Sequence, residues 1–370
     1  MEERQEHKVL MALEALKKAS KDVEINPNSG ADDGGGDSPS MKALLELETG
    51  SEDLFSGDPK LSALSHLLSH LKALASSLRS QSSSNSSGGG GRRGRGFLRL
   101  LLRRRFDGSS EISRVAGSIG SEIQSWLDRE YADHLIAALR SQSSDDDEKI
   151  ELLSALETRV SCGFDQGLQD VLLKADVYGA VEAALADKAV AKPVREHAAA
   201  AVLALVRFNK AVFVGPVLMG PAVGSIVSIA SAATLRVLRG LITHIRSPLV
   251  DVLHSDGKIP KLIALLSSGD LDIRAAAIEC CLEIGYFGRK EAIEAMMGEG
   301  LVKILMELQR SGEFPSSVAR FAIQLEVGEG LRQREKRAMK LEVVRRVKEA
   351  AITGGEAGTV LTEVLWGSTP

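Results

Sequence analysis

A self-similarity with a period of about 40 residues constrains the fold of this chain more than any other feature. Four apolar stretches align: AVEAAL from Ala180, AVGSIV from Ala222, KIPKLIALL from Lys258 and GLVKILMEL from Gly300. Each is followed by a second helical run, such as TLRVLRGLITHI, and a weaker fifth copy, HLIAAL, is anchored at Leu135. Such units cannot bury their apolar faces singly, so the period predicts a helical solenoid with one continuous core.

The composition agrees with helices rather than sheets. Aromatic residues make up only 4% of the 370 residues, while the apolar fraction is 44%. Sheets favour aromatic and β-branched side chains, whereas leucine and alanine favour helices. The formal net charge of −4 gives no reason to expect specific nucleic-acid binding by the whole chain.

The cysteines indicate a reducing compartment. There are three of them, Cys162 and the adjacent pair Cys280 and Cys281, which is no disulfide framework. The adjacent pair is expected to pack as small apolar side chains. The first residues, MEERQEHKVLMALEAL, lack the long apolar segment of a secretion signal, so we expect a cytoplasmic or nuclear protein, or both.

Residues 1–82 are expected to form an N-terminal helical region with a disordered break near residues 25–40, where glycine and polar residues dominate. Between Pro59 and Gln81, apolar residues recur at alternating steps of three and four. The helix that they predict packs within its own domain or pairs with another chain, and the first interpretation is favoured. The stripe consists of Leu61, Leu64, Leu68, Leu71, Ala75 and Leu78.

Residues 83–96 form a linker rich in serine, glycine and arginine, and residues 97–129 are expected to be a basic helix that leads into the solenoid. This part of the chain is a solvated flank, a nuclear targeting signal, or a contact for anionic lipid or nucleic acid. Aromatic residues that could stack on RNA are limited to Phe97 and Phe106. The basic patch comprises Arg92, Arg93, Arg95, Arg99, Arg103, Arg104 and Arg105.

One segment, from Ala211 to Ala233, contains no charged residue. Its prolines and glycines disfavour one continuous membrane-spanning helix, because each costs about 1–3 kcal/mol in a helix interior. We therefore expect two short buried helices that are joined between Gly215 and Pro221.

The stretch GKIPKLIALLSSGDLDIRAAAIECCLEIG, followed by GRKEAIEAMMGEGLVKILMEL, resembles the armadillo repeat. The matching elements are Gly-x-Ile-Pro at the start, the leucine pair, the Ser/Asp loop, the Ile-Arg-x-x-Ala helix and the glycine before the next unit. The resemblance covers roughly residues 130–325. It implies an all-α, right-handed armadillo-type α-solenoid, with armadillo repeats over residues 130–328.

The C-terminal part, RFAIQLEVGEGLRQREKRAMKLEVVRRV, is similar to plant armadillo-repeat proteins, which are related to the repeat regions of plant U-box ubiquitin ligases. No segment resembles a U-box. Residues 329–370 are expected to supply capping helices, because an amphipathic helix over Leu331–Ala351 places Met339, Val343 and Val347 on one stripe. A basic docking face is the alternative for this helix.

The resemblance also implies where a partner binds, because the third helices of successive armadillo repeats line a concave groove. Here these helices start near Val194, Leu235, Ile273 and Val318. Nuclear-import receptors of this fold clamp peptides with an asparagine, but Ala204 and Glu283 stand at that position, which argues against a reader of nuclear signals. The groove candidates are Arg195, Arg236, Arg239, Arg274 and Glu279.

No sequence pattern points to catalysis, a cofactor or a metal. The chain has no G-x-S-x-G, H-E-x-x-H, phosphate-binding loop or C-x-x-C motif. His66 and His70 have the spacing of metal ligands on a helix but lack a third ligand, and they are expected to be polar surface positions. The run from Ser141 to Glu148 is a solvated acidic loop or a phosphorylation site.

These observations predict a non-enzymatic scaffold that binds a protein partner, as a peptide or helix, through its groove. One alternative is an adaptor or competitor in ubiquitin ligation without ligase activity of its own. Another is a peripheral membrane protein that binds an anionic surface through Arg92–Arg105.

Overall fold

The computed structural model describes residues 2–25, 40, 42–44, 66–76, 95–141 and 144–366. Within these ranges every regular element is helical, which confirms the predicted all-α class. The chain divides into two compact units. The first comprises Met1–Asp133 with Gly167–Ala175, and the second comprises His134–Gln166 with Asp176–Pro370.

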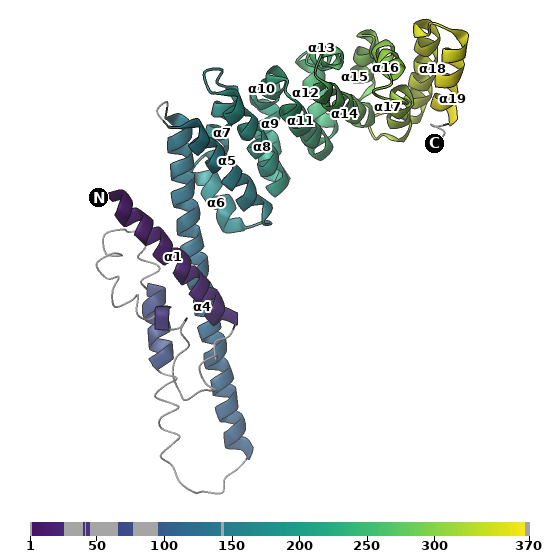
Figure 1. The fold of residues 1–370 in the computed structure, drawn as a ribbon. Helices are drawn as coiled ribbons and strands as arrows, with labels where there is room; N and C mark the ends of the chain where they lie inside the picture. The colour runs from purple at the N-terminus through teal and green to yellow at the C-terminus, as the bar shows by residue number, and fades with distance from the viewer. Residues whose placement is uncertain are drawn as a thin grey trace. The chain divides into compact units, whose positions relative to one another are not determined.

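The second unit is a solenoid of three-helix repeats (Figure 1). Two shorter helices precede a third helix in each of the groups α9–α11, α12–α14 and α15–α17. The helices of this unit are α5 (Asp146–Ser161), α7 (Val177–Ala186), α8 (Lys192–Phe208), α9 (Lys210–Met219), α10 (Ala222–Ile229), α11 (Ala232–Ile245), α12 (Ser247–Ser255), α13 (Ile259–Ala264), α14 (Leu271–Phe287), α15 (Lys290–Gly298), α16 (Leu301–Arg310), α17 (Ser317–Val327), α18 (Gln333–Ala350) and α19 (Gly354–Trp366).

Local sequence signals set where these helices begin. Ser231 and Thr234 form a capping box at the start of α11, each side chain bonding the other residue's backbone N–H. At the start of α14, the carboxylate of Asp270 accepts hydrogen bonds from two backbone N–H groups. Pro260 lies in the first turn of α13, where its missing N–H removes no helical hydrogen bond.

The core of the solenoid lies where each third helix packs on the next. The helices α5, α8, α11, α14 and α17 contact one another in that order. Buried side chains such as Leu238 in α11 and Ile278 in α14 fill this row. At Gly285 in α14 the approach is so close that a Cβ atom would lie 2.9 Å from the Phe321 ring in α17. A glycine is therefore required there for the two helices to stack.

The uncharged segment forms α9 and α10, and here the sequence-based expectation is partly wrong. The turn lies at Gly220 and Pro221, whereas α9 continues through Gly215 and Pro216. Pro216 is exposed, so its ring does not compete for space in the core. Only α10 is largely buried, and Met219 at the end of α9 is 91% exposed.

Among the described residues, no individual helix has both the length and the apolar character of a membrane span. Taken together, α9 and α10 satisfy these two criteria, but they are bent by 70° at their junction.

The first unit contains α1 (Glu2–Ile25), most of α4 (Arg95–Arg140), a helix over residues 66–76, and most of α6 (Gln166–Lys174). Leucines of α1 and of 66–76 pack against α4 in one apolar cluster, so the leucine stripe of 66–76 contributes to a core within the chain. Where α1 passes α4, a Cβ atom on Gly120 would lie 3.0 Å from the Ser20 hydroxyl oxygen, and that hydroxyl donates to the carbonyl of Ala116.

The basic helix expected over residues 97–129 is part of the 46-residue helix α4. This helix starts within the expected linker 83–96 and runs past the expected boundary at residues 129 and 130. The glycines within α4 do not end this helix, because apolar side chains of α1 and of residues 66–76 pack against it and offset the low helix propensity of glycine. Most of the expected break near 25–40 and residues 83–94 of the linker lie outside the described residues.

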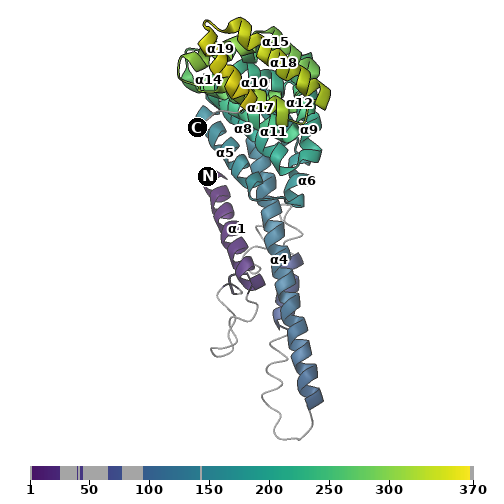
Figure 2. The same ribbon diagram turned by 90° about the vertical axis from the view of Figure 1, so that its right-hand side faces the viewer.

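The C-terminal residues pack over the last repeat. Seen from the C-terminal side, α18 and α19 lie in front of the preceding helices (Figure 2), and α18 contacts α16 and α17 while α19 contacts α17. The expected stripe is buried at Met339, Val343 and Val347. The amphipathic segment ends at Ala350, and α19 is a separate helix.

Replacement of a buried leucine in the row of third helices should destabilise the protein strongly. Leu238 is 0% exposed, so Leu238→Ala should lower the free energy of unfolding by about 2–5 kcal/mol in urea titrations. Leu271→Ala is the matched control, since Leu271 is 52% exposed and its truncation should cost less than about 0.5 kcal/mol. Equal effects of the two substitutions would contradict the proposed core.

Candidate partner-binding site

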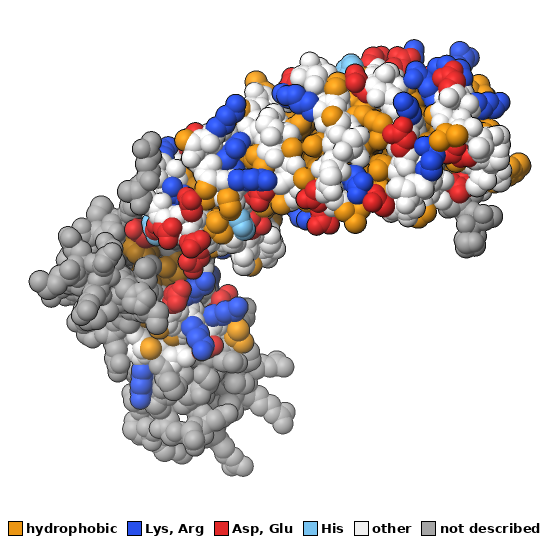
Figure 3. All heavy atoms as spheres, turned by 45° about the horizontal axis from the view of Figure 1, so that its top comes forward, with side chains coloured by type: hydrophobic (Ala, Val, Ile, Leu, Met, Phe, Trp, Pro, Cys, Tyr) orange, Lys and Arg blue, Asp and Glu red, His pale blue; other side chains and the backbone are white. Residues whose placement is uncertain are grey.

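A pocket of about 230 Å³ opens on the surface formed by the third helices α11, α14 and α17. Figure 3 shows acidic and basic side chains interspersed with hydrophobic ones over the solenoid face that it displays. The pocket combines both kinds of side chain, which suits it to a partner with charged and apolar groups. Its lining residues are Arg236, Arg239, Asp272, Ala275, Ala276, Ile278, Glu279, Phe314 and Arg320.

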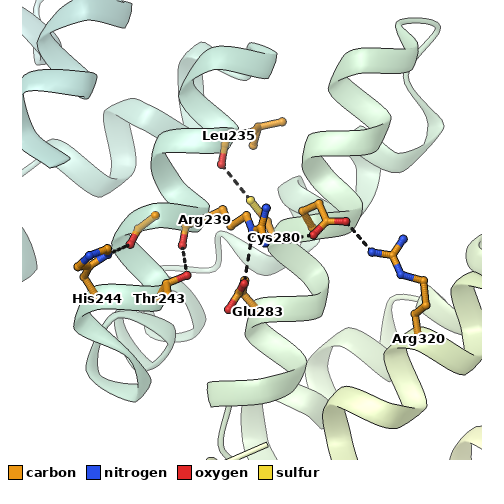
Figure 4. Close-up of polar contacts among 9 residues, drawn as sticks. Leu235, Arg239, Thr243, His244, Cys280, Glu283 and Arg320 are labelled. Atoms are coloured by element: carbon orange, nitrogen blue, oxygen red, sulfur yellow. Dashed lines mark hydrogen bonds and ion pairs between the residues drawn. The ribbon is translucent and has the colours of Figure 1, made fainter. Parts of the chain in front are cut away.

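Ion pairs join the three helices beside this pocket (Figure 4). Arg239 in α11 lies 3.3 Å from Glu283 and 3.5 Å from Glu279, both in α14. Glu279 is also 2.7 Å from a guanidinium nitrogen of Arg320 in α17. The Glu279 carboxylate therefore pairs with one arginine from the preceding repeat and one from the following repeat.

These pairs order the surface more than they stabilise the fold. The side chain of Arg239 is 48% exposed and that of Glu279 is 32% exposed, so water screens the attraction. An exposed pair is worth about 0–1 kcal/mol. The structural consequence is that Arg239 and Arg320 have partners within the chain.

Arg236 differs from the other two arginines of the pocket. It is exposed and makes no ion pair or side-chain hydrogen bond with any residue that the structure describes. The first turn of α11 contains no acidic residue that could offset its charge. Asp272 also lines the pocket, but it lies in the first turn of α14, where the positive end of the helix dipole favours a carboxylate.

Part of the pocket lining is apolar. Ala275, Ala276 and Ile278 of α14 contribute small or aliphatic groups. Phe314, from the loop between α16 and α17, adds an aromatic ring. A ligand that reaches Arg236 can therefore bury an apolar group nearby.

The structure brings together three of the five predicted groove residues, Arg236, Arg239 and Glu279. Arg195 is partly buried, and its Nε donates a 3.0 Å hydrogen bond to the carbonyl oxygen of Leu185. Arg274 lies near the pocket residues in sequence but is bound through both terminal nitrogens to Glu313, at 2.9 and 3.1 Å.

Asp272, Phe314 and Arg320 line the pocket but were not predicted as groove residues, whereas Glu283 was noted only as the residue at the position of the asparagine clamp. A signal for Arg320 exists, because it lies 41 residues after its partner Glu279, about one repeat period. Charges of opposite sign at equivalent positions of neighbouring third helices are expected to pair. Phe314 follows no such pattern, because it lies in a loop.

The two adjacent cysteines are structural. Both are buried, and the Cys280 thiol donates a 3.2 Å hydrogen bond to the carbonyl of Leu235 in α11 (Figure 4). Burial raises the pKa of the Cys280 thiol well above its usual value and raises the pKa of Cys281 to about 12. Both are therefore protonated at neutral pH, the form that is a poor nucleophile.

A serine and a histidine lie together at the contact of α5 and α8. Ser154 Oγ is 3.3 Å from His197 Nδ1. Burial raises the pKa of nearby Glu157, although His197 opposes this shift. The pair connects two neighbouring helices, which is a structural role for His197.

Within the described ranges, no three or more His, Cys, Asp or Glu residues are grouped so that they could hold a metal ion. His66 and His70 are both exposed. Of the predicted basic patch, Arg92 and Arg93 lie outside the described residues, while the backbone of Arg95–Arg105 belongs to α4.

No protein-family model and no curated protein matches this sequence. Solved structures with similarity include an engineered protein, with a TM-score of 0.47 and 18% identity over 64% of this chain and 95% of that chain. A designed armadillo repeat protein matches with a TM-score of 0.45 and 16% identity over 64% and 99% of the two chains. Another such design, in complex with the peptide (KR)4, has a TM-score of 0.45 and 16% identity over 62% and 98%.

At these TM-scores the likeness adds nothing to what the helices show directly. The order of two shorter helices and a third helix, repeated in α9–α17, is by itself an armadillo-like repeat.

Neutralising the shared carboxylate should weaken the contact between repeats in a salt-dependent way. Glu279→Gln should lower the free energy of unfolding by about 0.5–1 kcal/mol at low salt, because Arg320 loses its ion pair and Arg239 loses one of its two. The loss should shrink at about 1 M NaCl, where charges are screened. Glu307→Gln, an exposed change in α16, should have no effect, and a Glu279→Gln protein as stable as the unaltered chain would contradict the role of these pairs.

The three cysteine thiols should react at different rates, according to their exposure. At about pH 8, a chromogenic disulfide reagent should react rapidly with exposed Cys162 in the folded protein, and with Cys280 and Cys281 only after unfolding in urea. Cys162→Ser should abolish the rapid reaction. Equal rates for all three thiols in the folded protein would show that the α11–α14 contact opens readily.

Proposed function

We propose that this protein is a non-enzymatic scaffold that binds another protein, in the cytoplasm or nucleus, across the third helices of its armadillo-like repeats. The pocket between α11, α14 and α17 is the observation that carries this proposal. It is built from three successive repeats, so an extended partner segment would contact equivalent positions in turn.

The charge arrangement supports recognition rather than catalysis. Arg239, Glu279 and Arg320 hold one another in place, while Arg236 keeps its donors available to a partner. Prealigned side chains lose little conformational entropy on binding. The neighbouring apolar part of the lining then supplies contact area that a protein segment can cover.

The two alternatives from the sequence stay predictions. A role as an adaptor or competitor in ubiquitin ligation rests on the resemblance to the repeats of plant U-box proteins. A lipid contact rests on the arginines from Arg92 to Arg105, whose side chains lie outside what the structure describes. Flotation with anionic liposomes, with and without residues 92–105, tests the second: loss of membrane binding on deletion supports it, and no binding by the intact chain contradicts it.

A photocrosslinking amino acid placed on the third helices should capture a partner. Thr243 in α11 and Ile323 in α17 are exposed and lie one or two turns beyond the pocket arginines. Adducts are expected from these positions in extracts of cells that express the protein, because the partner lies across them. Control positions are Ser255 in α12 and Lys290 in α15, which are exposed on shorter helices. Equal capture from all four positions, or capture only from the controls, would contradict the proposal.

A further inference from the structure

We infer that the pocket binds an acidic side chain of an extended partner segment, which pairs with Arg236, and an apolar side chain a few residues away. This inference rests on the proposed function, since it names the chemistry that the same surface recognises. It depends on three observations: the unpaired charge of Arg236, the internal pairing of the other arginines, and the apolar part of the pocket lining beside them.

The ion pairs of the pocket determine which sign of partner charge Arg236 accepts. Arg239 and Arg320 are neutralised by Glu279 and Glu283, so this network contributes two positive and two negative charges. Asp272 is offset in part by the N-terminus of α14. Arg236 is the pocket arginine that makes no ion pair with a described residue, and a carboxylate fits its guanidinium by two parallel hydrogen bonds.

A basic partner side chain fits this site less well. It would meet Arg236 as a like charge, and Glu279 and Glu283 are already paired with Arg239 and Arg320. Asp272 is the pocket carboxylate outside these pairs, and the N-terminal end of α14 already favours its charge. Breaking those pairs would leave arginines unpaired, which offsets the new contact. The contacts of Arg236 therefore favour an acidic over a basic side chain at that position.

The distance between neighbouring helices sets how many residues separate the acidic and the apolar side chain of the partner. Packed helices lie about 8–10 Å apart, and an extended chain advances about 3.3 Å per residue. A segment that crosses from α11 to α14 therefore advances by about two or three residues. An apolar side chain two or three positions from the acid would lie against Ala275 and Phe314, which are both partly exposed.

Selection of short random peptides, displayed on phage, against the full chain tests this inference. Enriched peptides are expected to carry Asp or Glu with an apolar residue two or three positions away. For a selected peptide made synthetically, Arg236→Gln should raise the Kd about tenfold or more, and Arg236→Glu should raise it further by repulsion. Arg236 is exposed and unpaired among the described residues, so both variants should keep the circular dichroism and the unfolding midpoint of the unaltered protein.

Arg337→Glu is the matched control, because Arg337 is an exposed arginine of α18 outside the pocket and its reversal should leave the Kd unchanged. Selected peptides without an acidic preference, or with the same Kd for Arg236→Glu, overturn this inference. If such peptides still compete with the crosslinks from Thr243, the proposed function survives. A library that yields no binder for the unaltered chain counts against both.

Discussion

Burial of apolar faces between successive third helices is the interaction on which the rest of the second unit depends. Each of α8, α11, α14 and α17 covers one neighbour and is covered by the next. A repeat taken alone would expose this face to water, at a cost of about 1.5–3 kcal/mol for each large apolar side chain. Stacking therefore stabilises the repeats only as a set, and α18 and α19 pack over the last one.

The same stacking creates the candidate site. Close packing at Gly285 and Phe321 brings the third helices near enough for side chains on their outer positions to meet across repeats. Arg239, Glu279 and Arg320 meet in this way, although each lies about one period from the next. A pocket with polar and apolar walls is the result, and it needs three repeats to exist.

Much of the architecture could be predicted from the chain. The helical period, the capping residues Ser231 and Asp270 and the stripe around Val343 are local or periodic signals, which a sequence displays directly. The joint in the uncharged segment was predicted less well, because Pro216 is tolerated in α9 on its exposed side. The boundary between linker and basic helix was also misplaced, because α4 starts at Arg95, continues to Arg140 and packs against α1 over part of its length.

For the candidate site, the sequence and its resemblance to armadillo repeats predicted which helices would line the groove, and the sequence by itself determined that arginines lie on them. Only the tertiary structure decided which of those arginines are available. Arg274 is held by Glu313, Arg195 by a backbone carbonyl and Arg239 by two carboxylates, whereas Arg236 makes no such contact within the described chain. The physical reason is that an ion pair forms between atoms a few ångströms apart, and the distances between separate helices follow from packing, which residue types and spacing do not specify.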